Sequence, residues 1–357
     1  MKNFLKVLSS VTGPVGRIHL NNPGALNSLT ESMCIRIYEL LREWQDNDEI
    51  HIVAVTAEGD RAFCAGGDVR QVYNEGKDDP FAARRFFSTE YRMDLAIAEF
   101  SKPYICLIDG IVMGGGLGIS VNGQYRVLGD GVMAAMPETG IGLFPDVGAT
   151  AFLNSCPGRT GLYFGLTGTR LNTADALYAG FGTHYIKSNR HTELLEALQS
   201  AEYGDHPSDT VERILREFSS TPNQSGIAAK KGQIDQLFGA DSVETIISDL
   251  SKDNTAFALE TLEQLDRMSP TSLQITAKQI TDNPDISARD ALILEYRMMA
   301  HVLMNHDFYE GIRAALIDKD RTPRWSPKKL TKVMPGDVDA YFASLGEHEL
   351  VLNSHPK

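Results

Sequence analysis

The sequence predicts an α/β fold with a helical C-terminal region, and three observations carry this prediction. In the first half, short runs rich in β-branched residues alternate with amphipathic stretches of helical period. After about residue 185 the strand signals nearly vanish, and helical stretches follow one another between prolines. Two glycine-rich segments each follow a predicted strand, as turns from a strand into a helix do. Such alternation favours an α/β domain with mostly right-handed crossovers.

The N-terminal elements follow from local patterns. Residues 4–11 and 16–20 predict two strands joined by a Gly-Pro turn. The segment Ser28-Leu29-Thr30-Glu31 has the spacing of a capping box and opens a predicted helix. The continuous apolar run 52–56 predicts a strand that is covered on both faces. The apolar positions of the predicted helix fall on one face: Met33, Ile37, Leu40, Leu41 and Trp44.

Further along, the pattern predicts a helix from Pro80 to about Phe100, a strand over 104–109 and a helix from Ala149. We expect residues 1–205 to form the core with the active site, and residues 206–357 to form a helical region packed on it. The helical stretches after residue 185 are 192–200, 210–218, 243–250, 254–268, 271–280 and 287–305.

Composition excludes several classes of protein. The chain has 357 residues, of which 42% are hydrophobic, enough for a large core. The formal net charge of −13 argues against partners such as nucleic acid or an anionic membrane. No apolar run approaches the roughly 20 residues that span a bilayer, and residues 1–10 show no secretory signal. Four cysteines without CxxC spacing fit a reducing, cytoplasmic location, and the nine histidines show no metal-binding spacing.

The first unusual segment is 63–70, Phe-Cys-Ala-Gly-Gly-Asp-Val-Arg, after a predicted strand. Its small residues allow a turn with free backbone N–H groups, and a helix is predicted to begin near Asp68. By itself, this segment fits an ordinary strand-to-helix turn.

The second segment is 109–118, which contains Gly114, Gly115 and Gly116 in succession. It lacks the G-x-G-x-x-G pattern of dinucleotide sites, because Ile119 takes the last slot, and it lacks the Gly-Lys-Ser/Thr of a P-loop. Two interpretations stay open. A backbone N–H in this turn could stabilise negative charge on a carbonyl oxygen, or the glycines could serve close helix packing.

The third segment is 136–148, where Glu138 and Asp146 stand in a loop rich in apolar residues, glycine and proline. Apolar surroundings raise the pKa of a carboxyl group and suit it to acid–base catalysis near neutral pH. The alternative is structural, since either carboxylate could cap a helix or pair with an arginine. Capping is a fair competitor for Asp146, which precedes the helix predicted from Ala149.

In this order, the segments resemble the crotonase (enoyl-CoA hydratase/isomerase) superfamily, and within it the branch of 3-hydroxyisobutyryl-CoA hydrolases. The resemblance covers essentially the whole chain, including the helical C-terminal region. The motifs that carry it are 63–70, 136–147, 166–171 (LTGTRL), 269–273 (SPTSL), 295–297 (EYR), 307–311 (DFYEG) and 318–325 (DKDRTPRW).

The resemblance implies a core of ββα turns arranged as a spiral, and an acyl-CoA thioester as substrate. It places the thioester oxygen between two backbone N–H donors, carried over to Ala65 or its neighbour Gly66, and to Gly115. Glu90, ahead of a tyrosine, would line the acyl pocket. The resemblance implies no metal or redox cofactor, because CoA is part of the substrate, and relatives often form homo-oligomers.

The reaction type depends on two positions. Hydratases of the superfamily use two glutamates, and the first of those positions is occupied here by Gly118, which has no proton to transfer. Glu138 stands at the second, and Asp146 follows eight residues later, as in the hydrolase branch. The resemblance therefore implies a 3-hydroxyisobutyryl-CoA hydrolase of valine catabolism with Glu138 and Asp146 as its catalytic pair. An isomerase or hydratase, and a catalytically silent CoA-binding protein, are the alternatives.

Overall fold

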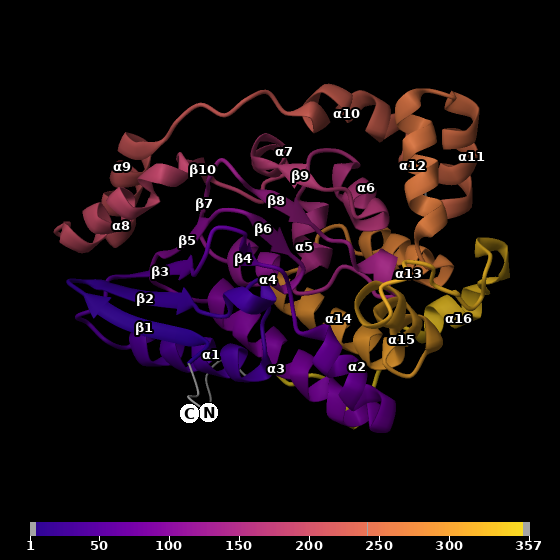
Figure 1. Ribbon diagram of the computed structural model, residues 1–357, viewed down its shortest axis with the longest axis horizontal. Coiled ribbons are helices and arrows are strands. Elements are labelled where there is room, and N and C mark those ends of the chain that lie inside the picture. Colours follow the sequence, from indigo (N-terminus) through magenta and orange to yellow (C-terminus); the bar gives the residue numbers. More distant parts are fainter. Residues whose placement is uncertain (1–4, 241, 353–357) are drawn as a thin grey trace. The chain divides into compact units, whose positions relative to one another are not determined.

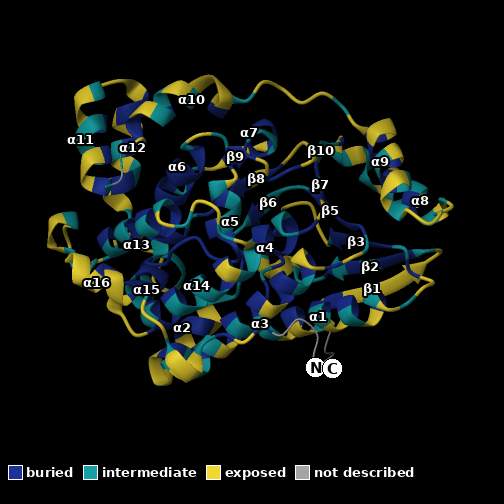
Figure 2. Ribbon diagram, turned by 180° about the vertical axis from the view of Figure 1, so that it is seen from behind, coloured by how far each residue is buried: buried dark blue, intermediate teal, exposed yellow. Residues whose placement is uncertain are grey.

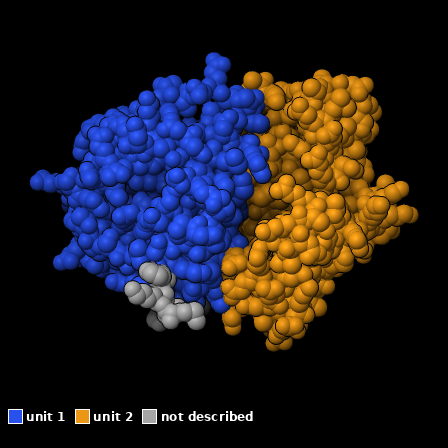
Figure 3. Space-filling view, viewed as in Figure 1, with its two compact units in different colours: residues 1–67, 92–134, 170–228 blue, residues 68–91, 135–169, 229–357 orange. Residues whose placement is uncertain are grey.

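The computed structural model describes residues 5–240 and 242–352 (Figure 1). The chain forms two compact units, each assembled from three separate stretches of sequence (Figure 3). Unit 1 comprises residues 1–67, 92–134 and 170–228, and unit 2 comprises residues 68–91, 135–169 and 229–357. The predicted start of the first strand, Phe4, lies outside the described residues.

A six-stranded mixed sheet lies in unit 1, with strand order β1-β2-β3-β5-β7-β10. β1 and β2 form the predicted antiparallel hairpin, and the pairings from β2 to β10 are parallel. β3 and β5 are buried almost throughout (Figure 2), so the prediction of a strand covered on both faces is confirmed for β3. The strands are β1 (Val7–Thr12), β2 (Val15–Leu20), β3 (Ile52–Ala57), β5 (Tyr104–Ile108), β7 (Tyr125–Leu128) and β10 (His184–Tyr185).

A second, four-stranded sheet has the order β4-β6-β8-β9. β4 pairs with β6 in parallel, and β8 pairs with β9 antiparallel, so this sheet is mixed as well. Its short strands were not resolved by the sequence pattern. They are β4 (Ala62–Cys64), β6 (Ile111–Met113), β8 (Met133–Ala135) and β9 (Leu171–Asn172).

The helices of unit 1 complete its core. α1 (Glu31–Gln45) buries all five apolar positions that its periodicity predicts. Its N-cap, however, is Thr30, whose side chain accepts from the backbone N–H of Met33, so the helix begins two residues later than the expected capping box at Ser28–Glu31 predicts, and with Met33 at the third helical position no capping box forms. α8 and α9 pack over one part of the large sheet through an apolar cluster that includes Val15 and Ile105. The helices are α4 (Gly115–Val121), α7 (Thr173–Tyr178), α8 (His191–Ser200) and α9 (Pro207–Phe218).

Unit 2 is mostly helical. α3 (Pro80–Ala98) begins in unit 2 and ends in unit 1, and α10 (Gly226–Leu237) runs from unit 1 into unit 2. The other helices of unit 2 are α2 (Val69–Asp78), α5 (Ala149–Asn154), α6 (Thr160–Thr167), α11 (Val243–Asp253), α12 (Ala256–Arg267), α13 (Pro270–Thr281), α14 (Ala288–Val302), α15 (His306–Ile312) and α16 (Pro335–Ala340).

The predicted α/β fold with a helical C-terminal region is thus confirmed. All six helical stretches predicted after residue 185 correspond to helices of the structure, whereas α10, α15 and α16 were missed. The division of the chain at residue 205 stays a prediction. Within residues 5–240 and 242–352, no helix combines the length and the apolar character that crossing a membrane requires.

Candidate active site

The two glycine-rich turns approach each other inside unit 1. Gly66 has a φ of 103° and Gly114 a φ of 49°, backbone conformations that favour glycine. A Cβ atom on Gly66 would lie 3.2 Å from the carbonyl oxygen of Met113 and 3.7 Å from the backbone nitrogen of Gly115. The predicted donor segments, one after β4 and one after β6, therefore lie side by side.

The backbone N–H groups of these turns differ in their partners. The N–H of Ala65 donates to the carbonyl of Leu26 at 3.0 Å. Neither the N–H of Gly66 nor that of Gly115 donates a hydrogen bond to another residue that the structure describes. Gly116 serves packing, because a Cβ there would lie 2.2 Å from the carbonyl oxygen of Cys64. Close packing thus accounts for Gly116, while the role of Gly115 as a donor to a carbonyl oxygen stays a prediction.

Three predicted carboxyl groups lie together in unit 2. Glu90 is on α3, Glu138 begins the short helix η2 (Glu138–Ile141), and Asp146 is in the loop before α5. Their exposed fractions are only 2%, 6% and 7%. No ion pair to any of the three occurs among the described residues, so the alternative of pairing with an arginine finds no support.

Burial controls the electrostatics of this cluster. It raises the pKa of Glu138 well above the ordinary glutamate value, and the negative charge of Asp146 raises it further. The pKa of Glu90 is raised by the same two causes, in the same order. Burial also raises the pKa of Asp146, to about 6, although its hydrogen bond from Tyr91 opposes the rise. Buried carboxyls with raised pKa values are characteristic of sites of acid–base catalysis.

Hydrogen bonding distinguishes the three carboxyls. The Tyr91 hydroxyl donates to Oδ2 of Asp146 at 2.7 Å. By contrast, Oε2 of Glu138 and Oε1 of Glu90 are buried and have no hydrogen-bond partner among the described residues. A buried oxygen without a partner is costly, and at a functional site it marks an atom that is free to meet a ligand or water.

The chain turns sharply just after Asp146. Val147 has a φ of 57° and Gly148 a φ of 90°. A β-branched residue in the left-handed region is a strained conformation, costing about 1–3 kcal/mol. α5 then begins at Ala149, with Gly148 as its N-cap and no capping side chain from that residue. The structure thus gives no support to a capping role for Asp146, whose Oδ2 accepts the Tyr91 hydroxyl instead.

The carboxyl that does hold the start of α5 belongs to Glu295, on α14. Its Oε2 accepts from the N–H of Gly148 at 2.7 Å, and its Oε1 accepts from the N–H of Thr150 at 2.8 Å. The Thr150 hydroxyl donates to Oε1 as well, at 2.7 Å. Burial raises the pKa of Glu295 to about 8, despite these three donors.

The segment that begins with Glu138 is held by two of the motifs named above. The N–H of Ser269 donates to the carbonyl of Thr139 at 3.0 Å, and the Ser269 hydroxyl donates to Oδ2 of Asp307 at 2.6 Å. Gly142 packs so tightly that an added Cβ would lie 2.1 Å from the carbonyl oxygen of Asp307. The SPTSL and DFYEG motifs therefore support the loop that carries Glu138.

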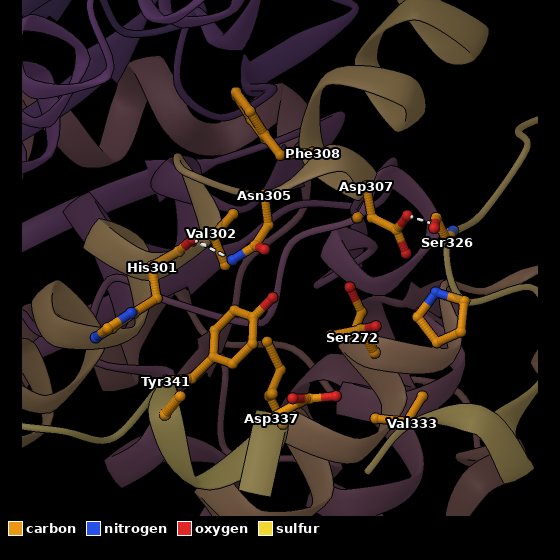
Figure 4. Close-up of a pocket in the computed structure, with 15 residues that line it drawn as sticks. Ser272, His301, Val302, Asn305, Asp307, Phe308, Ser326, Val333, Asp337 and Tyr341 are labelled. Carbon is orange, nitrogen blue, oxygen red and sulfur yellow. Dashed lines mark hydrogen bonds between the residues drawn. The ribbon is translucent and has the colours of Figure 1, made fainter.

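A cavity of about 380 Å³ lies elsewhere in unit 2, between α13, α14, α15 and α16. Figure 4 shows the side chains of Asn305 and Tyr341 directed toward each other across it, with Ser272 and Asp307 beside them. None of the predicted site residues lines this cavity. In the described part of the chain, no group of three or more His, Cys, Asp or Glu side chains is arranged to hold a metal ion.

The sequence alone gave no role to two residues of the site. Tyr91 was only the tyrosine that follows Glu90, and Glu295 was only part of a motif. A signal for Glu295 was present: it stands among the buried positions of α14, together with Leu292 and Met299, so it is a carboxyl on an apolar helix face. No comparable pattern singles out Tyr91, because buried tyrosines are common.

With this geometry established, comparisons with known proteins identify the class. Residues 15–342 match the family described as enoyl-CoA hydratase/isomerase. The chain belongs to this family, the crotonase superfamily, and has the crotonase fold with two mixed sheets and a helical C-terminal region. It is 42% identical over 355 residues to the mitochondrial 3-hydroxyisobutyryl-CoA hydrolase of Danio rerio, covering 97% of this chain and 92% of that protein.

Two solved structures are similar over nearly the full length. A carnitinyl-CoA dehydratase from Mycobacterium thermoresistibile superposes with a TM-score of 0.92 at 37% identity, covering 99% of this chain and 100% of that one. An enoyl-CoA hydratase from Rhodobacter sphaeroides 2.4.1 superposes with a TM-score of 0.89, also at 37% identity, covering 97% and 100%. The expected superfamily and hydrolase-like branch are confirmed, while the names of these relatives span two reaction types.

Proposed function

We propose that this chain hydrolyses the thioester of a short branched hydroxyacyl-CoA, and that 3-hydroxyisobutyryl-CoA, from valine catabolism, is its substrate. The observation that carries the proposal is the buried Oε2 of Glu138, which has no hydrogen-bond partner among the described residues. Water or the thioester carbon could meet this oxygen. The identity of 42% to a 3-hydroxyisobutyryl-CoA hydrolase supports the choice of substrate.

In the proposed reaction, Glu138 acts in one of two ways. As a general base it takes a proton from water, whose oxygen attacks the thioester carbon while the C–S bond breaks and CoA leaves as a thiol. As a nucleophile it attacks that carbon itself, releases CoA and forms an anhydride, which water then cleaves to acid and free Glu138. Asp146 orients the hydroxyl of the substrate or passes the proton, and Glu90 lines the acyl group.

The backbone N–H groups of Gly66 and Gly115 are the proposed donors to the thioester oxygen as negative charge develops on it. The N–H of Ala65, the other candidate, already donates to Leu26, which favours Gly66 of the two neighbours. Preorganised backbone donors need no side chain, and losing one typically costs about 3 kcal/mol of transition-state stabilisation.

A second candidate function is an enoyl-CoA isomerase or hydratase, favoured by the names of the two similar solved structures. A single glutamate such as Glu138 could move the proton of an isomerisation. Against hydration stands Gly118, at the position where hydratases of the superfamily carry their other glutamate. A catalytically silent CoA-binding protein would have no need of buried carboxyls with raised pKa values.

The deciding experiment compares two reactions of the purified wild-type chain. Release of CoA thiol is measured with 3-hydroxyisobutyryl-CoA and a panel of short acyl-CoAs, and hydration of crotonyl-CoA is measured in parallel. We expect thiol release to exceed hydration by at least about 100-fold, the contribution of a missing acid–base group. Hydration that equals or exceeds thiol release would overturn the hydrolase assignment. Binding of CoA without either reaction would favour the silent protein.

Location and assembly complete the proposal. All four cysteines are buried, and none forms a disulfide with another described residue, which suits the reducing cytoplasm proposed from their spacing. The similar hydrolase of Danio rerio is named mitochondrial, so imaging of the tagged full-length chain in its own cells is the test, and co-localisation with mitochondria would contradict us. A homo-oligomer, as relatives often form, is tested by light scattering on the purified chain.

A further inference from the structure

Glu295 is a buried carboxyl that the proposed chemistry does not use. None of its surface is exposed, and it accepts hydrogen bonds from the N–H groups of Gly148 and Thr150 and from the Thr150 hydroxyl, at 2.7, 2.8 and 2.7 Å. All three donors belong to the segment directly after Asp146. The buried carboxyl of α14 is thus committed to the segment beside a proposed catalytic residue.

This segment is one that needs to be held in place. Val147 and Gly148 both have positive φ, at 57° and 90°. A strained backbone of this kind persists only where its surroundings over-determine it, and such positions cluster at functional sites. The turn also sets the direction in which the chain leaves Asp146.

Gln279, on α13, secures the other side of the same segment. Its Nε2 donates to the carbonyl of Pro145 at 2.7 Å and to the Thr150 hydroxyl at 2.8 Å. The Thr150 hydroxyl therefore accepts from Gln279 and donates to Glu295, which joins the two anchors into one network. Asp146 lies between the anchored positions 145 and 148.

We propose that Glu295 is a positioning residue: by holding the turn Val147–Thr150, its carboxyl fixes where Asp146 presents its own carboxyl. This inference rests on the proposed function, which gives Asp146 a role in the reaction, and it deepens that function by naming a residue that positions Asp146. Glutamine could not replace this carboxyl. The turn donates hydrogen bonds to both oxygens of Glu295, whereas glutamine has a single acceptor oxygen, and its NH₂ group would face a backbone N–H. Glu295→Gln therefore disturbs the turn while changing the volume of the side chain little.

The test is a double-mutant cycle between Glu295 and Asp146, measured as kcat and KM for thioester hydrolysis. We expect Glu295→Gln to lower kcat by at least about 10-fold with KM changed less than about 3-fold, the pattern of a loss in the transition state. In an Asp146→Asn background, the same change should cost less than about 2-fold, because residues that act through one another are not additive. Equal losses in both backgrounds, or an unchanged kcat in Glu295→Gln, would overturn the proposal.

A matched control separates positioning from general destabilisation. Asp175, in unit 1, is also a buried carboxyl that accepts a hydroxyl, from Ser225 at 2.7 Å, and a backbone N–H, from Ile227 at 3.0 Å. Asp175→Asn should lower the melting temperature without the loss in kcat. A loss in kcat as large as that of Glu295→Gln would show that any broken carboxyl anchor has this effect, and would count against a specific role.

A second pair of variants covers the case in which Glu295→Gln does not fold. Thr150→Val removes the hydroxyl shared by Glu295 and Gln279 at almost constant shape, and Thr150→Ser restores it. We expect the valine variant to lose kcat and the serine variant to recover to within about 3-fold of the wild type. Equal kcat values for the two variants would contradict the proposal.

The inference and the proposed function can fail separately. The cycle is measured on whichever reaction the wild type catalyses, with affinity for an acyl-CoA as a parallel readout. A wild type that hydrates enoyl-CoA and leaves thioesters intact would end the hydrolase assignment alone. The coupling between Glu295 and Asp146 would then be read from the rate of hydration, where additive losses would again refute it.

Discussion

The hydroxyl of Tyr91 donates a hydrogen bond of 2.7 Å to Oδ2 of Asp146, and both side chains are buried. The bond lowers the pKa of Asp146, opposing the rise that burial causes. One hydroxyl group thus fixes both the direction and the proton affinity of a proposed catalytic residue.

We expect Tyr91→Phe to lower kcat by about 10-fold and to move the acid side of the pH–rate profile to higher pH, because Asp146 loses a donor that stabilises its charged form. The profile of kcat between pH 5 and pH 9 is the measurement. Tyr104→Phe is the control: its hydroxyl, equally buried, donates to the carbonyl of Ile119 at 3.0 Å in unit 1. It should lose stability alone, and a pH shift in this control would contradict our assignment.

Asp146→Asn should reduce kcat by about 100-fold or more, the range typical for loss of a positioned acid–base group, with the fold intact. If Asp146 served only the structure, asparagine could still accept the Tyr91 hydroxyl, and turnover would stay near normal. Steady-state kinetics and circular dichroism decide between these outcomes. Asp175→Asn, whose carboxyl also accepts a hydroxyl at 2.7 Å, serves as the control for breaking a buried contact.

The rate of hydrolysis should rise with pH and reach its plateau only above about pH 6. The ionised form of Glu138 is the active one in both proposed routes, and burial raises its pKa well above the ordinary value of 4.5. Asp146, whose pKa burial raises to about 6, contributes to the same rise of the rate with pH. The measurement is kcat/KM against pH, which reports the free enzyme. A plateau that already extends down to pH 5 would show that neither group limits the rate.

Glu138→Gln should abolish most activity and yet stabilise the protein at high pH. A carboxyl whose pKa is higher in the folded state than in the unfolded state holds its proton more tightly when folded. As pH rises above the unfolded value of about 4.5, this contribution to stability is lost, and glutamine avoids the loss. We expect a gain in melting temperature of about 2 °C or more at pH 8 that shrinks toward pH 5. A gain that does not vary with pH would refute this account.

The fold could be predicted from sequence because its signals are local. The apolar face of α1 and the continuous apolar run of β3 each indicate, within a few residues, which side chains are buried. The strands of the second sheet have only two or three residues each, too few for a period to show. The helix α10 was not predicted, because Lys230, Lys231 and Gly232 separate its apolar residues, which therefore form no continuous stripe along one face.

The candidate site was predictable only in part. Composition singled out Glu138 and Asp146, since carboxyls are rare in an apolar loop, and the resemblance supplied Glu90. The partners of these residues come from distant positions: Tyr91 lies 55 residues from Asp146, and Glu295 lies 147 residues from Gly148. Local patterns carry no information about such contacts. The roles assigned to the carboxyls and to the backbone donors stay predictions until the variants are measured.

The distance in sequence between Gly148 and Glu295 has a consequence for the newly made chain. A ribosome adds roughly 5–20 residues each second, so these 147 residues leave the Asp146 turn without its anchor for roughly 7–30 s. During that interval the strained backbone at Val147 has no compensating carboxyl. Nascent chains that end before α14 should therefore be cut by proteases within 145–150, and those that extend past α14 should be protected there. The C-terminal helices, which are synthesised last, would then hold in place a loop that was synthesised long before them.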